Sequence, residues 1–245
     1  MPEKYNYIDK GSGEIIILLH GLMGAVSNFE DTIKRLPKYG YRVILPLLPL
    51  YEMPVLKTNV NELVKFIENF TIDRGIEEYS ILGNSLGGHI GLILALKHPK
   101  NVKRLILSGS SGLYENTLGG TFPKRGDYNY IKKKTEEVFY NPEKATKKLV
   151  DEVFDIVNKR EKVIRVLMMA KSAMRHNMKD DLPYIKQKTC IIWGKNDKVT
   201  PPEVGREFHR SINNSELFWI DHCGHAPMIE TPVEFNNILV KWLKG

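Results

Sequence analysis

One serine in this chain lies in a setting suited to nucleophilic chemistry. Ser85 belongs to the pentapeptide Gly-Asn-Ser-Leu-Gly at 83–87, directly after the apolar run 79–82 and before a helical stretch at 86–98. A strand, Gly-x-Ser-x-Gly and a helix are the context of a nucleophile elbow, in which a strained backbone exposes the hydroxyl. Glycines two residues to either side leave room where strand and helix cross. We expect Ser85 to be a nucleophile; a glycine-rich turn without chemistry is the alternative.

A serine nucleophile needs a base, and seven histidines compete for that role. His225 is the strongest candidate, because it lies just past the last predicted strand, with a glycine before it and a proline shortly after it. His222 is the rival and lies nearer the strand end. His89, four residues beyond Ser85, is expected to be structural.

The orienting acid should lie between the serine and the histidine, in the order Ser, Asp or Glu, His. Asp197 fits this order. It follows the penultimate predicted strand as His225 follows the last, so both are expected at the same edge of a parallel sheet. Asp221 is the competitor, and a turn aspartate before a helix is the interpretation without function.

Acyl transfer also needs donors for a developing oxyanion. The loop 20–24, His-Gly-Leu-Met-Gly, follows the first strong strand, and its glycines allow backbone N–H groups to turn inwards. The expected hydrogen-bond donors are the backbone N–H groups of Leu22 and Leu86. Loss of one such donor typically lowers the reaction rate by about 10²–10³-fold. His20, next to Gly21, is expected to support the loop by hydrogen bonds and not to act as a base.

The elements that must position these residues alternate between apolar runs and amphipathic stretches. Strands of near-continuous hydrophobicity separated by helices indicate an α/β fold, with a mostly parallel central sheet and helices on both faces. Such sheets bind ligands at the carboxyl ends of their strands. The predicted strands are 14–19, 42–46, 79–82, 102–108, 189–193 and 216–220, and the predicted helices are 27–38, 59–74, 86–98, 201–212 and 232–243.

Residues 119–182 interrupt this alternation with helical patterns at 128–140, 142–158 and 161–174. We expect them to form a helical cap, or lid, over the carboxyl edge of the sheet, while 1–118 and 183–245 form the core. The segment holds 15 Lys and Arg against 10 Asp and Glu, so it carries most of the net charge of +7. Solvated helix faces explain this excess most simply, and steering of anionic substrates is the functional alternative. The apolar residues that pack the cap or line a pocket include Phe122, Phe139, Tyr140, Met168, Met169 and Met174.

Length and composition limit the class of protein. A chain of 245 residues that is 42% hydrophobic suits one sizeable domain. It has no apolar run of about 18 residues and no signal-like N-terminus, so no transmembrane helix is expected. Cys190 and Cys223 match neither a disulfide framework nor a metal site. We expect reduced thiols, no metal, no organic cofactor and a cytoplasmic location, with secretion as the alternative.

Together these motifs resemble the α/β-hydrolase family over nearly the whole chain. They are His-Gly at 20–21, Gly-x-Ser-x-Gly at 83–87, Gly-x-x-Asp-x-Val-x-Pro at 194–201 and Gly-His at 224–225. The resemblance implies the α/β-hydrolase fold, with Ser85 as nucleophile, His225 as general base and acid, and Asp197 as its orienting partner. It also implies that 119–182 is the cap.

Within that family the chain looks most like the hydrolases of meta-cleavage products, which split carbon–carbon bonds. The similar segments are 83–88, 193–198 and 221–225. Many of those enzymes carry a tryptophan after the catalytic histidine, where this chain has Ala226, and the dipeptide 22–23 replaces their glycine-rich oxyanion loop. They also use a cap arginine for the substrate carboxylate, where approximate alignment places Val153. The residues that could substitute for it are Arg160, Arg165 and Arg175. These departures favour ester hydrolysis through an acyl-enzyme, with C–C hydrolysis second.

Two interpretations without ester or C–C hydrolysis stay open. A binding protein of the same fold that lost catalysis would not react with a fluorophosphonate probe. A nucleic-acid or membrane-surface binder would show salt-dependent retention on DNA or anionic lipid, although the basic residues are scattered. We therefore expect a small ester or related acyl compound, including anionic ones, as the partner, with no nucleic acid and no stable membrane insertion.

Overall fold

A seven-stranded sheet forms the centre of the computed structural model, which describes residues 4–24, 26–115 and 124–245. The strand order is β1-β3-β2-β4-β5-β6-β7. Every neighbouring pair is parallel except β1 and β3, so the predicted mostly parallel sheet is confirmed. The strands are β1 (Tyr7–Lys10), β2 (Glu14–Leu19), β3 (Tyr41–Pro46), β4 (Tyr79–Asn84), β5 (Val102–Ser108), β6 (Lys188–Gly194) and β7 (Ser215–Ile220).

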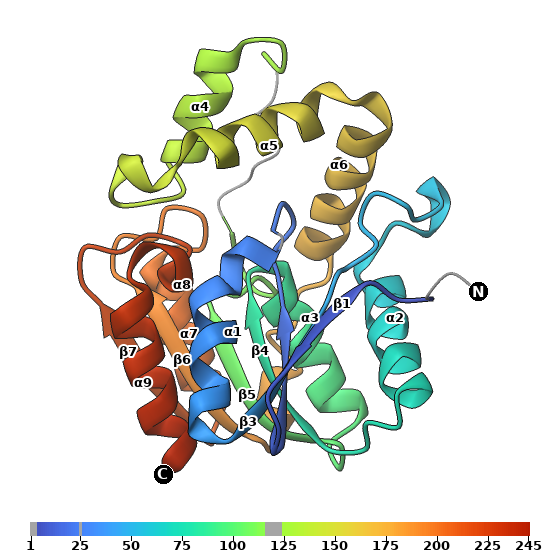
Figure 1. The fold of residues 1–245 in the computed structure, drawn as a ribbon, viewed down its shortest axis with the longest axis vertical. Coiled ribbons are helices and arrows are strands. Elements are labelled where there is room, and N and C mark those ends of the chain that lie inside the picture. The colour runs from blue at the N-terminus through green and yellow to red at the C-terminus, as the bar shows by residue number, and fades with distance from the viewer. Residues whose placement is uncertain (1–3, 25, 116–123) are drawn as a thin grey trace.

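Helices cover both faces of this sheet, as Figure 1 shows. Alternate side chains of β2 pack into two separate hydrophobic cores, one on each face of the sheet. Ile17 and Leu19 pack with α2, α3 and α7, whereas Ile16 and Leu18 pack with α1, α8 and α9. Strands buried on both faces are apolar throughout because neighbouring side chains point to opposite sides. The helices are α1 (Glu30–Arg35), α2 (Val60–Asp73), α3 (Leu86–Lys97), α7 (Pro202–Ser211), α8 (Pro227–Glu230) and α9 (Pro232–Lys244).

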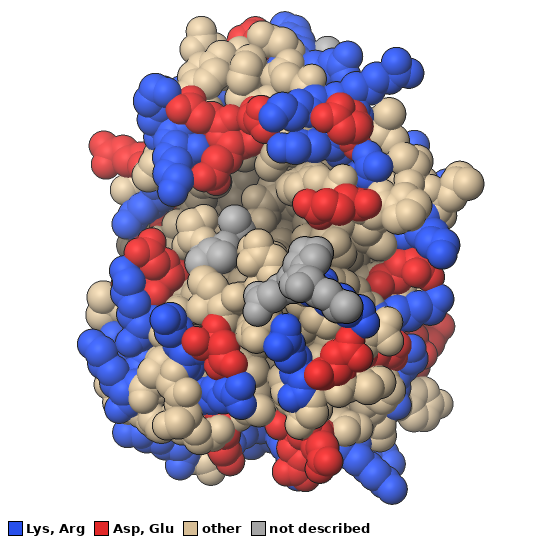
Figure 2. All heavy atoms as spheres, turned by 45° about the vertical axis from the view of Figure 1, so that its right-hand side comes forward, with Lys and Arg blue, Asp and Glu red and all other residues tan. Residues whose placement is uncertain are grey.

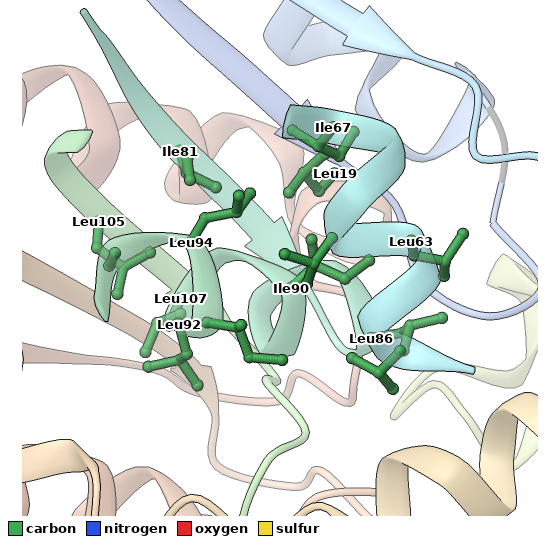
Figure 3. Close-up of a cluster of buried hydrophobic side chains, with 14 of the residues drawn as sticks. Leu19, Leu63, Ile67, Ile81, Leu86, Ile90, Leu92, Leu94, Leu105 and Leu107 are labelled. Atoms are coloured by element: carbon green, nitrogen blue, oxygen red, sulfur yellow. The ribbon is translucent and has the colours of Figure 1, made fainter. Parts of the chain in front are cut away.

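The helix after Ser85 is the most deeply buried. Every residue of α3 from Leu86 to Ala95 is buried, which is the pattern of a helix with no solvent face. Figure 3 shows its Ile90 and Leu94 inside a cluster shared with α2 and the neighbouring strands. Removing one such side chain typically costs about 2–5 kcal/mol. The start of α3, next to Ser85, is therefore firmly held.

The predicted helix at 27–38 is interrupted. The structure has a 3₁₀ turn at Val26–Phe29, then α1, then a second 3₁₀ turn at Leu36–Tyr39. Pro37 explains the second change, because proline lacks an N–H and disrupts the α-helical hydrogen bonds around it. Gly40 ends the segment with φ +84°. The sequence pattern predicts neither the strand β1 (Tyr7–Lys10) nor the short helix α8 (Pro227–Glu230) that the structure contains.

Three helices between β5 and β6 stand at the carboxyl end of the sheet (Figure 1). They are α4 (Tyr128–Glu136), α5 (Lys147–Asn158) and α6 (Arg160–Arg175), and short 3₁₀ turns lie at Pro142–Lys144, Leu182–Tyr184 and, outside this region, Val55–Lys57. A small core holds them together, made of Ile131, Val153, Val157 and Val163. We call residues 124–182 the helical insertion. The predicted cap boundary at 119 and Phe122 lie outside the described residues, so that boundary stays a prediction.

None of the helices that the structure describes has the length and apolar character needed to cross a bilayer.

Candidate active site

The order of the strands fixes one place for a ligand. β3 lies on one side of β2 and β4 on the other, so the chain leaves this part of the sheet in opposite directions. Diverging connections open a crevice at the carboxyl ends of such strands. The loop after β2 begins at His20, and Ser85 directly follows β4. The predicted oxyanion loop and the predicted nucleophile therefore meet at this crevice.

Ser85 has the strained backbone of an elbow. Its φ is +54°, in a region that residues other than glycine seldom occupy. A Cβ on Gly83 would lie 2.4 Å from the carbonyl carbon of Gly87, and a Cβ on Gly87 would lie 1.9 Å from the carbonyl oxygen of Leu19. Both flanking positions therefore require glycine. For Gly83 the reason is the one inferred from the sequence, the crossing of β4 and α3, whereas for Gly87 it is the close approach of α3 to the end of β2.

The elbow is tied to the loop that follows β5. The backbone N–H of Ser85 donates to the carbonyl oxygen of Ser108 at 3.1 Å, and the carbonyl oxygen of Ser85 accepts from the N–H of Ser111 at 3.1 Å. These two hydrogen bonds to a neighbouring segment keep Ser85 in its strained backbone conformation, which would otherwise be unfavourable.

Asp197 and His225 form a buried pair. Nδ1 of His225 lies 2.9 Å from Oδ2 of Asp197, and their residues are 7% and 4% exposed. Asp197 Oδ1 also accepts from the N–H groups of Val199 and Thr200 at 2.8 and 2.9 Å, and Oδ2 accepts from the Thr200 hydroxyl at 2.8 Å. Because a carboxylate only accepts, Nδ1 of His225 carries the proton and Nε2 keeps its lone pair.

The protonation of His225 depends on this partner. Burial lowers the pKa of His225, but the charge and the hydrogen bond of Asp197 outweigh it, and the charge of Glu115 adds to them. The net pKa is raised above the ordinary 6.5. Proton uptake by the imidazole is thus favoured by its surroundings, as a general base requires.

Two residues that the sequence did not single out, Asn84 and Gly109, lie against His225. The side-chain amide of Asn84 donates to the carbonyl oxygens of Ser108 and His225 at 2.9 and 3.2 Å. A Cβ on Gly109 would lie 2.9 Å from Nδ1 of His225, so the loop after β5 packs directly against the ring. Asn84 lies in the elbow pentapeptide directly before Ser85. An amide side chain at that position is the only feature of the sequence that could have indicated this supporting role.

His20 supports the loop after β2. It is 2% exposed, its Nδ1 lies 2.9 Å from the carbonyl oxygen of Gly21, and its Nε2 accepts from the N–H of Leu48 at 3.2 Å. Burial lowers the pKa of His20, so the neutral ring serves as donor and acceptor. A Cβ on Gly21 would lie 3.3 Å from Cβ of Ser85, so this loop closely approaches the elbow. The use of the Leu22 N–H as an oxyanion donor stays a prediction, as does that of Leu86.

A cavity of about 170 Å³ is lined by the candidate nucleophile, the candidate base and both expected oxyanion donors. Ser85, His225, Leu22 and Leu86 all line it. Its other walls come largely from apolar side chains of the helical insertion, including Phe139, Val153, Met169 and Met174. Figure 2 shows a hollow below the insertion in which mostly uncharged side chains are visible, with many charged side chains on the surface around it. Apolar walls with a few polar groups are typical of a small-molecule site.

Of the other apolar residues expected in the cap, Tyr140 packs on the ring of His222, with centroids 5.2 Å apart, and Met168 lines a separate surface hollow. His222 and Asp221, the competitors for the base and the acid, are both exposed, and Asp221 pairs with Lys195 at 2.7 Å. His89 is buried and bonds to His176 at 3.0 Å.

No cluster of three or more His, Cys, Asp or Glu suited to a metal occurs among the residues described.

The cavity also has charged residues that sequence reasoning missed. Glu115 and Lys134 line it, and Lys134 pairs with Glu137 at 2.7 Å. Neither lies in a motif, so only the fold could place them there. The three candidate arginines are absent from the described lining; Arg165 instead donates to the carbonyl oxygen of Met53 at 2.6 Å.

An α/β-hydrolase is the class of protein that this fold and site define, and comparison with known proteins confirms it. The family model described as serine aminopeptidase, S33, matches residues 51–232, so the chain belongs to this hydrolase family.

Individual relatives differ in activity. An α/β hydrolase enzyme from the metagenome of lagoon sediments of Mar Chica, Morocco, is 43% identical, with a TM-score of 0.82 over 100% of this chain and 96% of that one. The 2-hydroxy-6-oxo-6-phenylhexa-2,4-dienoate hydrolase of Comamonas testosteroni is 25% identical over 98% of this chain and 91% of its own length. An esterase of Exiguobacterium antarcticum, 24% identical over 98% of this chain and 96% of its own, has a TM-score of 0.85, which shows the shared fold.

Proposed function

We propose that this hydrolase cleaves small carboxylic esters through an acyl-enzyme, with Ser85 as nucleophile, His225 as general base and acid, and Asp197 as its orienting partner. The observation that carries the proposal is the buried Asp197–His225 pair, whose imidazole lines one cavity with the strained Ser85. A cytoplasmic location stays a prediction.

The proposed reaction has two halves. His225 Nε2 takes the proton of Ser85 as the hydroxyl oxygen attacks the ester carbonyl, and the N–H groups of Leu22 and Leu86 stabilise the oxyanion. Collapse of the tetrahedral intermediate breaks the C–O bond, and His225 returns the proton to the leaving alcohol. Water then attacks the acyl carbonyl and gives its proton to His225. Collapse of this second tetrahedral intermediate breaks the bond between the acyl carbon and Ser85 Oγ, which takes the proton back from His225 as the carboxylic acid leaves. Asp197 keeps the proton on Nδ1 throughout.

The walls of the cavity favour an ester over a dienoate. Val153 is buried and lines the cavity. It lies at the position where approximate alignment places the cap arginine of the meta-cleavage product hydrolases. Ala226 lines it where many C–C hydrolases carry tryptophan. Lys134 is the basic side chain in the described lining, and it already pairs with Glu137. A substrate carboxylate would therefore compete with Glu137 for this cation.

C–C hydrolysis is the second candidate. It is favoured by the full-length similarity to the dienoate hydrolase of Comamonas testosteroni, whose named substrate is a carboxylate. The same serine, histidine and aspartate would serve that reaction, so the two candidates differ in what the cavity accepts.

The test is a series of p-nitrophenyl esters from acetate to laurate, run beside a meta-cleavage dienone acid. Ser85→Ala, which keeps the fold but removes the nucleophile, is the control. We expect ester turnover that peaks at one chain length and falls by at least about 10³-fold in Ser85→Ala. Fast cleavage of the dienone acid with feeble ester turnover would establish the second candidate instead. Ester turnover that persists in Ser85→Ala would overturn the assignment of the nucleophile.

A further inference from the structure

An acidic side chain shares the cavity with the proposed nucleophile and base. Glu115 comes from the loop after β5 and lines the same space as Ser85 and His225. The other walls are mostly aliphatic or methionine side chains, so this carboxyl group lies in a largely apolar setting. The reaction proposed above makes no use of it.

Among the residues that the structure describes, no Lys or Arg forms an ion pair with Glu115, and the basic residue of the lining, Lys134, pairs with Glu137. The sequence 116–123, Asn-Thr-Leu-Gly-Gly-Thr-Phe-Pro, contains no charged residue. Burial raises the pKa of Glu115, and the charge of His225 opposes that rise. A carboxylate held in apolar surroundings without a partner is incompletely solvated, and a ligand that supplies a positive charge or a donor would compensate it.

We propose that Glu115 makes this cavity selective for charge: it favours esters that carry an ammonium group, accepts neutral ones and rejects those that carry a carboxylate. The proposal rests on the ester hydrolysis proposed above and names its substrate class. Two like charges in a partly desolvated site repel each other more strongly than in water, whereas opposite charges attract. A difference of about tenfold or more between substrates of opposite charge is the expected scale.

The experiment compares three p-nitrophenyl esters of equal chain length whose acyl chains end in methyl, carboxylate or trimethylammonium. The quantity measured is the ratio of kcat/KM for the trimethylammonium ester to that for the carboxylate ester, at constant ionic strength. We expect a ratio of about ten or more in the unaltered protein and a ratio close to one in Glu115→Gln. The ratio compares two substrates on one protein, so a partly unfolded preparation does not distort it.

Two further variants make the test specific. Glu143→Gln removes the same charge from an exposed position on the helical insertion, away from the cavity lining, and should leave the ratio unchanged. Glu115→Lys should invert the order of the two charged esters. A ratio that is the same in Glu115→Gln and the unaltered protein, or a carboxylate ester that is the best substrate, would overturn the inference while the ester hydrolysis stands. Absence of Ser85-dependent turnover of the methyl-ended ester would instead overturn the proposed function, and this inference with it.

Discussion

One carboxylate oxygen of Glu230 accepts a hydrogen bond from the backbone N–H of Gly224, the residue before His225, at 2.6 Å. The other oxygen accepts from the N–H of Asn141 in the helical insertion, also at 2.6 Å. The N–H of His225 itself donates to the carbonyl oxygen of Val138 at 2.9 Å. The loop that presents the imidazole is therefore held against the insertion by a single buried carboxylate and a backbone bond.

Replacing Glu230 with alanine should destabilise the protein and slow it. Glu230 is 5% exposed, and its loss leaves the buried N–H group of Gly224 and the partly buried one of Asn141 without acceptors. Leaving the buried group unpaired costs about 1–3 kcal/mol of folding free energy, which for a chain of this size lowers the Tm by at least about 2 °C. Thermal unfolding and ester kinetics on the same preparation provide the measurement. Glu234→Ala, at an exposed position of α9, is the matched control and should change neither quantity. An unchanged Tm in Glu230→Ala would show that water satisfies both groups.

The pH dependence of activity should follow the raised pKa of His225. The free enzyme needs a neutral imidazole, so kcat/KM falls as pH drops through this pKa, and the midpoint should lie above 6.5. Because the ionised Glu115 contributes to the rise, Glu115→Gln should move the midpoint to lower pH. The check is kcat/KM for a neutral p-nitrophenyl ester between about pH 5 and 9. A midpoint below 6.5, or one that moves up in Glu115→Gln, would contradict this account.

Much of the site could be predicted because its parts are local. Ser85, Asp197 and His225 each follow a strand whose continuous apolar run is easy to read, and the carboxyl ends of parallel strands share one edge. For the same reason the apolar runs at 14–19 and 102–108 coincide with β2 and β5. The motif residues were therefore found without knowledge of tertiary contacts.

The missed features depend on contacts between distant segments. Nothing near Glu230 in the sequence indicates that it bonds to Asn141, 89 residues away. Glu115 likewise resembles any loop glutamate until the fold places it in the cavity. The edge strand β1 is only half-buried and pairs antiparallel, so it lacks the apolar run that marked the others.

The glycine after the elbow should tolerate no side chain. In Gly87→Ala the new Cβ would lie 1.9 Å from the carbonyl oxygen of Leu19, an overlap that only a backbone shift relieves. Strain of this kind typically costs about 1–3 kcal/mol or more, and it would displace Ser85. We expect a lower Tm together with a loss of ester turnover. The control is Gly126→Ala, since no atom lies within 4 Å of a Cβ there. Equal behaviour of the two variants would refute the steric explanation.

The two cysteines should be unreactive in the folded protein. Cys190 and Cys223 are both 0% exposed. Burial raises the pKa of Cys223 to about 12, and it also raises that of Cys190 well above its ordinary value. Since the thiolate is the reactive form, N-ethylmaleimide at about pH 7.5 should add to neither thiol of the native protein and to both after denaturation, as mass spectrometry would show. Ester turnover should survive the native treatment unchanged. Rapid addition of maleimide to Cys223 under native conditions, located by peptide mass spectrometry, would mean that the loop before His225 opens far more readily than its hydrogen bonds indicate.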